Sequence, residues 1–213
     1  MDQIIGRLIE TLTEPVDYET IKSGTDIQSS TRLSDYLTAL QNSFVIASIP
    51  YIDPSKKRMI MRKRRKYYFR DPFIYHAFRS WVYGLEPFES SRYAVKDPTT
   101  RGIIVENLTC EYLVRYAVVA NRRSLVDPLS HIPYIGYWKT KRGEVDFIIK
   151  LGNKAIPIEV KYREKISKVE LGALIRLVQA FKNKGIVVSK KPEDLLEEHY
   201  YVAIPAPIFM LMF

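Results

Sequence analysis

The sequence has little of what ties small proteins together or anchors them in membranes. A single cysteine, Cys110, in 213 residues excludes a disulfide framework within the chain and a zinc site built on cysteines. No run approaches the roughly 20 apolar residues that span a bilayer, and the polar start MDQ is unlike a secretory signal. The three histidines, His76, His131 and His199, lie far apart without metal-ligand spacing. These absences favour a soluble, cytoplasmic protein with no membrane partner.

The sequence does have an excess of positive charge, concentrated in one segment. It holds 33 Lys and Arg against 24 Asp and Glu, a formal net charge of +9. Residues 1–50 carry a net charge of −4, whereas residues 51–80 carry +8. A basic surplus gathered in this way favours a polyanionic partner, nucleic acid above all.

The centre of this charge is a basic tract, residues 56–66 (KKRMIMRKRRK), with eight basic side chains among eleven. We predict that it forms the loop between two strands at residues 44–50 and 65–69, where it contacts the phosphates of nucleic acid. A plain solvated loop or a localisation tract is the alternative. The expected nucleic-acid-binding residues are Lys56, Lys57, Arg58, Arg62, Lys63, Arg64, Arg65 and Lys66, with Arg32 on a preceding helix.

The first fifty residues have the spacing of three short helices. Asp17 is expected to cap the second helix, and Ser29 or Ser30 the third. Together with the two strands, this order suggests a winged helix-turn-helix domain over residues 1–84. Its last helix would begin at Asp71, which is followed by proline. The outward residues of the third helix mix charges, so we expect backbone binding rather than sequence-specific reading.

The rest of the chain, residues 85–213, is expected to form a second domain of mixed α/β (α+β) class with the order α-β-β-β-α-β. A polar stretch containing proline, residues 84–100, is the expected boundary. The predicted elements are a helix at about 101–120, strands near 134–138, 144–151 and 154–162, a helix opened by a capping box at Ser167, and a buried strand at 185–189.

The second and third of these strands carry the candidate site. Gly152 at the first position of a two-residue turn pairs strand residues whose numbers sum to 305. Asp146 then lies opposite Glu159, and Glu144 opposite Lys161. Two carboxylates about 5 Å apart repel by roughly 3 kcal/mol at an effective dielectric of ~20. A sequence built for stability alone would avoid this pair, so we interpret it as a binding site for a hard divalent cation, Mg²⁺ or Mn²⁺.

The same residues resemble a known superfamily. Asp146 followed by Glu159-Val160-Lys161, within the order α-β-β-β-α-β, is similar to the PD-(D/E)xK nucleases. The phrases KYYFRDPFIYHAF, GIIVENLTCEYL, YWKTKRGEVDFII and IPIEVKY also resemble a winged helix and nuclease-like domain that follow AAA-type ATPase modules in archaea and bacteria. The resemblance implies a restriction-endonuclease-like core with a mixed sheet. It also implies metal ligands at Asp146 and Glu159, a catalytic Lys161, and a supporting carboxylate at Glu106.

One departure from that family leaves the function open. No phosphate-binding loop of the form GxxxxGK[ST] occurs in the chain, so an ATPase would have to act in trans. Our first hypothesis is a metal-dependent nuclease that hydrolyses DNA phosphodiester bonds. The alternatives are a non-catalytic nucleic-acid-binding or regulatory module that partners an AAA-type ATPase, and a winged-helix transcription regulator.

Overall fold

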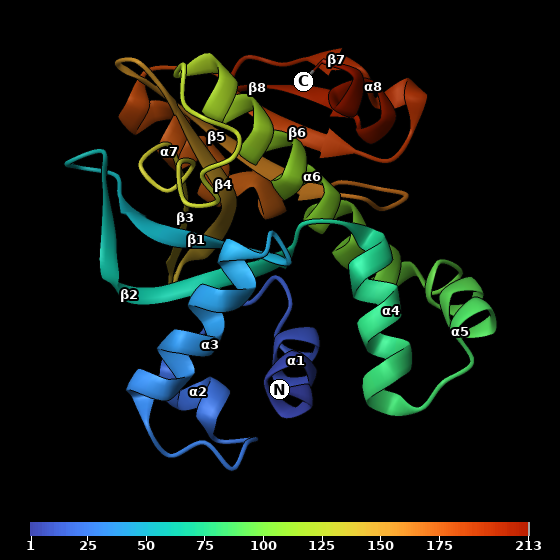
Figure 1. Cartoon of the computed structure of the whole chain (residues 1–213). Coiled ribbons are helices and arrows are strands. Elements are labelled where there is room, and N and C mark those ends of the chain that lie inside the picture. Colours follow the sequence, from blue (N-terminus) through green and yellow to red (C-terminus); the bar gives the residue numbers. More distant parts are fainter. Residues whose placement is uncertain (213) are drawn as a thin grey trace.

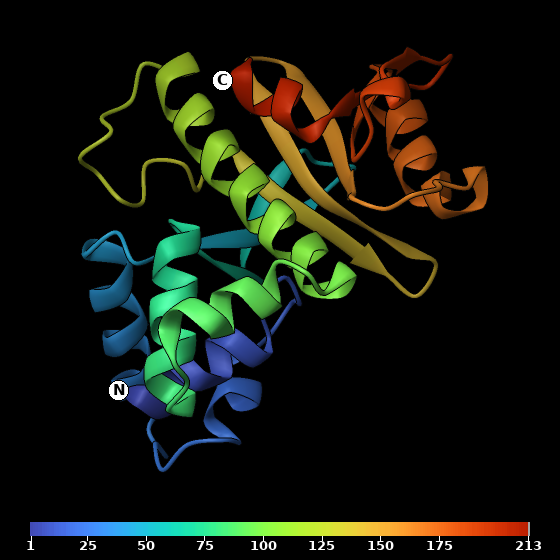
Figure 2. The same cartoon turned by 90° about the vertical axis from the view of Figure 1, so that its right-hand side faces the viewer.

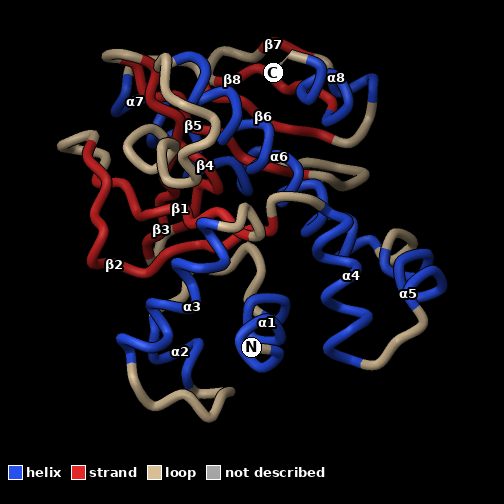
Figure 3. The backbone as a smooth tube through the Cα atoms, in the orientation of Figure 1, coloured by secondary structure: helices blue, strands red, loops and turns tan. Residues whose placement is uncertain are grey.

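A computed structural model describes residues 1–212, which fold into a mixed α/β structure with one central sheet. Eight helices lie around a sheet of eight strands in the order β2-β1-β3-β4-β5-β6-β8-β7, an arrangement that can be followed in Figures 1 and 3. The sheet pairs its strands both parallel and antiparallel. The predicted fold class is therefore confirmed.

The elements have the following bounds. The helices are α1 (Asp2–Glu10), α2 (Tyr18–Lys22), α3 (Ser30–Asn42), α4 (Pro72–Tyr83), α5 (Pro87–Ala94), α6 (Pro98–Ala120), α7 (Gly172–Phe181) and α8 (Ala206–Leu211). The strands are β1 (Ile46–Asp53), β2 (Arg58–Phe69), β3 (Ile135–Thr140), β4 (Gly143–Leu151), β5 (Lys154–Lys161), β6 (Gly185–Ser189), β7 (Leu196–Glu197) and β8 (Tyr201–Pro205). Two short 3₁₀ turns lie at Lys168–Leu171 and Pro192–Asp194.

The predicted helix starts of the N-terminal part are confirmed by their caps. The Asp17 carboxylate accepts the backbone N–H of Thr20, and Ser29 caps α3 in the same way. Asp71 caps α4, whose first residue is Pro72. These side chains satisfy backbone donors that a helix leaves unpaired at its start. The winged helix-turn-helix itself stays a prediction.

The hairpin of β1 and β2 does not stand apart as a free wing. Tyr51 of β1 pairs with Tyr137 of β3 in parallel, so the hairpin continues the central sheet. In Figure 1 the two strands run beneath β3 and β4, above helices α1 to α3. Residues from the two expected domains therefore share one sheet.

The basic tract is a strand rather than the predicted loop. β2 begins at Arg58, and only the turn before it holds Lys56 and Lys57. Between the pairs Pro50–Arg65 and Tyr51–Ile60 the register shifts, so residues 61–64 leave the ladder. We call residues 61–64 the basic excursion; its side chains are exposed. Our prediction was wrong because Ile60 favours a strand, and half-buried Met59 and Ile60 pair with Ile52 and Tyr51 of β1.

The expected boundary at residues 84–100 also contains a helix that we did not predict. α5 is capped by Glu86 and has proline at its first position, the same signal that opens α4. The next helix, α6, starts at Pro98 behind the cap Asp97, earlier than expected. Figure 2 shows α4 and α5 below the long α6.

The C-terminal part has its helices on both faces of the sheet. β3, β4 and β5 are antiparallel, and β6 and β8 continue the sheet in parallel. Figure 2 shows α6 on one side of the strands and α7 on the other. Gly152 adopts φ +57°, as the predicted turn requires, and the pairs Leu151–Lys154, Ile149–Ile156 and Phe147–Ile158 are confirmed.

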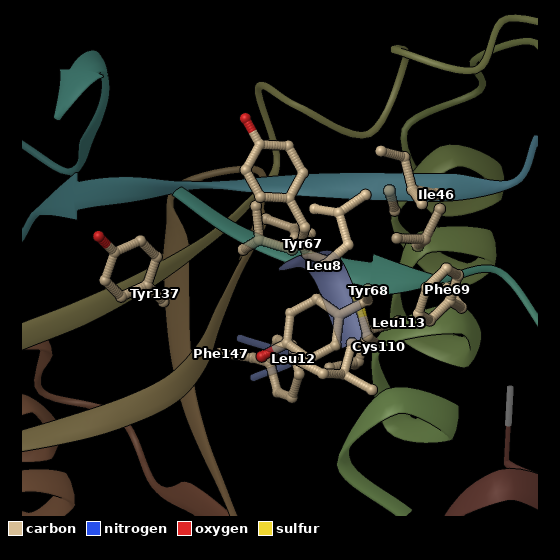
Figure 4. Packing of buried hydrophobic residues seen from close by; sticks show 14 of the residues in the cluster. Leu8, Leu12, Ile46, Tyr67, Tyr68, Phe69, Cys110, Leu113, Tyr137 and Phe147 are labelled. Carbon is tan, nitrogen blue, oxygen red and sulfur yellow. The ribbon is translucent and has the colours of Figure 1, made fainter. Parts of the chain in front are cut away.

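One apolar core joins the N-terminal helices, the hairpin and α6. Tyr68 of β2 lies against Phe147 of β4, with ring centroids 5.4 Å apart, and Cys110 and Leu113 of α6 complete the group (Figure 4). Cys110 is buried in this packing. Among residues 1–212, no helix has the length and apolar character to cross a bilayer.

Candidate active site

Asp146 is placed by a bulge in β4. Gly136 pairs with Ile148, but Trp138 pairs with Val145. Between these two pairs β4 therefore contains one residue more than β3. Beyond the bulge the alternation of side chains is reversed. Val145 packs with the α7 side of the sheet, although Phe147, two residues on, packs with the α6 side. A bulge re-aims side chains in this way, and here it turns Asp146 towards α6.

Because of the bulge, the predicted pairs Asp146–Glu159 and Glu144–Lys161 do not lie directly opposite each other in the ladder. The ladder between β4 and β5 ends at Phe147–Ile158, one step short of Asp146. Asp146 Oδ2 instead accepts the backbone N–H of Val160 at 2.9 Å. Glu144 does not lie against Lys161: its carboxylate binds Lys139 of β3 at 2.6 Å. Asp146 and Glu159 remain neighbours, since the Asp146 N–H donates to Glu159 Oε2 at 3.4 Å.

Lys66 is the central finding that sequence reasoning missed. We had assigned it to solvent-exposed nucleic-acid binding, but its side chain is 1% exposed. The ammonium lies 3.2 Å from Glu106 Oε1, 2.6 Å from Glu144 Oε1 and 3.2 Å from Asp146 Oδ1. Burial disfavours the charged form, but the three carboxylates outweigh it and raise the pKa of Lys66 above its ordinary value.

Glu106, on α6, lies at the cluster as predicted from the resemblance. Its Oε1 accepts a hydrogen bond from the Tyr68 hydroxyl at 2.6 Å and another from Lys66. Tyr68 and Lys66 are two residues apart on β2, so they reach Glu106 from the same face. Burial and the nearby charge of Asp146 raise the pKa of Glu106 above its ordinary value.

Glu159 and Lys161 form an ion pair along one side of β5. Glu159 is 4% exposed, and burial followed by the charge of Asp146 raises its pKa. The paired glutamate in turn helps to raise the pKa of Lys161, against the effect of burial. The Glu159 carboxylate therefore holds the lysine rather than standing open to solvent.

A pocket of about 580 Å³ opens beside this cluster. Three of the four predicted catalytic residues line it, namely Glu106, Asp146 and Lys161, whereas Glu159 does not. Further basic side chains that we did not predict also line it: Arg101, Arg163 and Lys190. The pocket lies where the parallel strands β5 and β6 end, the edge at which open α/β sheets bind ligands. That rule was the signal that could have found Lys190, directly after β6.

The donors suit a hard divalent cation in kind. Three carboxylate oxygens already converge on one cation, the ammonium of Lys66, and carboxylates are the ligands that Mg²⁺ and Mn²⁺ prefer. As the side chains stand, however, the described part of the chain offers no group of three His, Cys, Asp or Glu that could hold a metal ion. The chemistry fits, and the ammonium fills the place where the oxygens meet.

The remaining predicted nucleic-acid-binding residues lie outside this pocket. Arg62, Lys63 and Arg64 are exposed in the basic excursion, where Lys63 lies 3.8 Å from the ring centroid of Tyr51. Arg65 is half-buried and is held by backbone bonds to Val16. The others are placed as follows: Lys56 and Arg58 are exposed at the hairpin tip, Lys57 is half-buried there, and Arg32 is exposed on the first turn of α3.

The histidines play no part in the cluster. His131 is buried, contacts the Ser48 carbonyl at 3.1 Å through Nε2, and burial lowers its pKa to about 4. His76 is half-buried on α4, and His199 lies beside the ring of Tyr200 near β8. The sequence pattern favours helix-surface or loop positions for the histidines, and His131 lies in the loop before β3, although its side chain is buried.

Fold and pocket together define a mixed α/β protein with a lysine-filled carboxylate cluster at the edge of its sheet. Comparison with protein families then places it: residues 101–209, about half of the chain, match the domain of unknown function DUF4143, and the chain belongs to this family. The family is found in proteins associated with AAA-type ATPases. Residues 1–84 match a second domain of unknown function, DUF8612. No curated protein and no solved structure gives a significant match.

Proposed function

We infer that the protein is a metal-dependent nuclease whose pocket beside Lys161 hydrolyses phosphodiester bonds, with DNA as the expected substrate. One observation carries this proposal. The pocket presents two carboxylates that share a cation position, Glu106 and Asp146, next to a lysine, and basic side chains at Arg101, Arg163 and Lys190 surround them. A metal-dependent nuclease needs carboxylates that bind the cation and basic side chains that bind the phosphates of the substrate.

The residues have distinct roles in this proposal. A bound Mg²⁺ or Mn²⁺ would polarise a phosphoryl oxygen and make its bound water a better nucleophile. Asp146 and Glu106 supply carboxylate oxygens to hold it. Lys161, fixed by Glu159, places a positive charge where negative charge grows on the phosphate. Arg163 and Lys190 neutralise flanking phosphates. Glu159 is thus a positioning residue in this arrangement, not the direct ligand that the resemblance implied.

The test of the proposal is a cleavage assay. Purified protein is incubated with labelled single-stranded, duplex and branched DNA, once with Mn²⁺ and once with EDTA. We expect product with Mn²⁺ alone, because the carboxylates need the cation to meet a phosphate without repulsion. No product from any substrate in Mn²⁺ would reject hydrolysis of DNA.

A second function is favoured by a different observation. Every carboxylate of the acidic cluster already has a lysine partner, with Lys66 on three carboxylates and Lys161 on Glu159. Such a cluster can serve as scaffold in a non-catalytic module that binds nucleic acid or regulates an ATPase acting in trans. The family's association with AAA-type ATPases supports this alternative. Binding that persists in EDTA, without cleavage in Mn²⁺, would favour it.

Either function predicts a contribution from the basic excursion. Replacing Arg62, Lys63 and Arg64 by alanine should weaken binding to unrelated duplexes about equally. It should also reduce the slope of log K against log salt by about 2 to 3, since each phosphate contact contributes ~0.9. Fluorescence anisotropy over a salt series measures both quantities.

A matched variant controls for net charge alone. Lys96, Lys141 and Lys154 are exposed elsewhere on the surface, so their replacement by alanine removes the same charge. If both triple variants reduce the slope equally, the excursion makes no specific contact with the phosphates.

A further inference from the structure

We propose that Lys66 is a built-in counter-ion, supplied by the N-terminal hairpin, which occupies the cation position of the site until a divalent cation displaces it. This inference rests on the proposed metal-dependent function and adds a control that the function alone does not require. It assigns a role to the charged cluster residue that comes from the other matched part of the chain, residues 1–84.

The balance of charge around Lys66 favours exchange. Three carboxylates, Glu106, Glu144 and Asp146, face two ammonium groups, Lys66 and Lys139, so the positive charge falls one short. A divalent cation in place of the ammonium at Glu106 and Asp146 would match the two negative charges of these carboxylates. Because the cluster is largely buried, such an imbalance costs more than it would in water.

The structure gives the two cations separate routes to the cluster. Glu106 and Asp146 line the pocket, so a metal ion can reach them from solvent. Lys66 does not line the pocket and arrives from β2, behind the carboxylates. The two cations therefore reach the carboxylates by different routes, the metal ion through the pocket and the ammonium from β2.

Lys66 also has contacts that it would keep after displacement from Asp146 and Glu106. Its shortest contact is with Glu144, at 2.6 Å, and Glu144 does not line the pocket. The ring centroid of Tyr137 lies 5.9 Å from the ammonium, within the range of a cation–π contact. Lys66 can thus release Asp146 and Glu106 yet keep Glu144 as a partner, which makes its displacement feasible without leaving a bare charge.

One consequence concerns the organisation of the chain. The carboxylates come from α6 and β4 within residues 101–209, whereas the counter-ion comes from β2 within residues 1–84. The site is composite, so the N-terminal part sets the metal affinity of the C-terminal part.

The test is a titration of the full-length protein with Mn²⁺, measured by calorimetry and by thermal melts in EDTA and in Mn²⁺. Lys66→Met should bind Mn²⁺ about tenfold more tightly than the native protein, because the competing charge is gone. It should also melt at a lower temperature than native protein in EDTA and recover in Mn²⁺. Lys154→Met, which replaces an exposed lysine at the far end of the β4–β5 hairpin, should leave both quantities unchanged.

Each outcome decides the inference. Weaker or unchanged Mn²⁺ binding by Lys66→Met would overturn it, as would the absence of Mn²⁺ binding by both proteins. If Lys66→Met folds only in Mn²⁺, the inference is supported. If it folds in neither condition, Lys66→Gln, which also lacks the charge, takes its place, and Mn²⁺ binding by Lys66→Gln no tighter than by native protein overturns the inference. Native protein that binds Mn²⁺ but cleaves no DNA would reject the proposed function and leave the exchange intact.

Discussion

Replacing Lys161 by methionine should reduce metal-dependent cleavage of DNA by about a hundredfold or more. Loss of one preorganised positive or hydrogen-bonding group at a developing anion costs about 10²–10³ in rate. We assign this role to Lys161, which lines the pocket and which Glu159 holds beside Asp146. The measurement is the rate of product formation in Mn²⁺ with native protein and variant.

The control for this prediction lies on the same strand. Lys154 begins β5 at the far end of the hairpin and is exposed, so Lys154→Met should cleave at the native rate. Melts of both variants check that the fold persists. Native-rate cleavage by a folded Lys161→Met would remove the lysine from the mechanism.

Replacing Asp146 by alanine should lower the free energy of unfolding in EDTA by about 3 to 5 kcal/mol. The carboxylate is a partner of the buried Lys66 and also accepts the Val160 backbone N–H at 2.9 Å. Alanine leaves an ammonium short of one partner and a buried donor unsatisfied. Asp146→Asn keeps an oxygen for Val160, so its loss should be smaller. Urea unfolding of the three proteins measures the differences.

This expectation reverses the one that the sequence suggests. Two bare carboxylates would repel, so neutralising one would stabilise the metal-free protein. Lys66 and Lys161 reverse the expected direction of the stability change, because Asp146 has Lys66 as a partner and Glu159 has Lys161. As a control, Glu164→Ala removes an exposed carboxylate of the same pocket and should change the stability little. Equal or greater stability of Asp146→Ala would show that the lysines do not compensate the pair.

The sequence predicted the β4–β5 hairpin well because the information is local. A glycine-led two-residue turn sets the register, and alternation carries it as far as Phe147. It failed at the next residue because the bulge is set by pairing with β3, an interaction outside the hairpin. Asp146 is the first residue at which the register set by the turn no longer predicts the pairing.

Lys66 illustrates a harder limit. A basic tract is read locally as a solvated face, and for Arg62 to Arg64 the exposure agrees. Lys66 is buried because the hairpin joins β3 and brings it against carboxylates 40 and 80 residues away. No spacing within the tract distinguishes it from its neighbours. The identity of its three partners requires the tertiary structure.

We infer that the carboxylate cluster is a divalent-cation site that lysine occupies in the metal-free protein. The most direct measurement is an anomalous difference map from crystals grown in EDTA and then soaked in Mn²⁺. We expect a manganese peak at the carboxylates of Asp146 and Glu106, with the Lys66 ammonium withdrawn from Asp146. A map without a peak, in which Lys66 still joins all three carboxylates at saturating Mn²⁺, would contradict it.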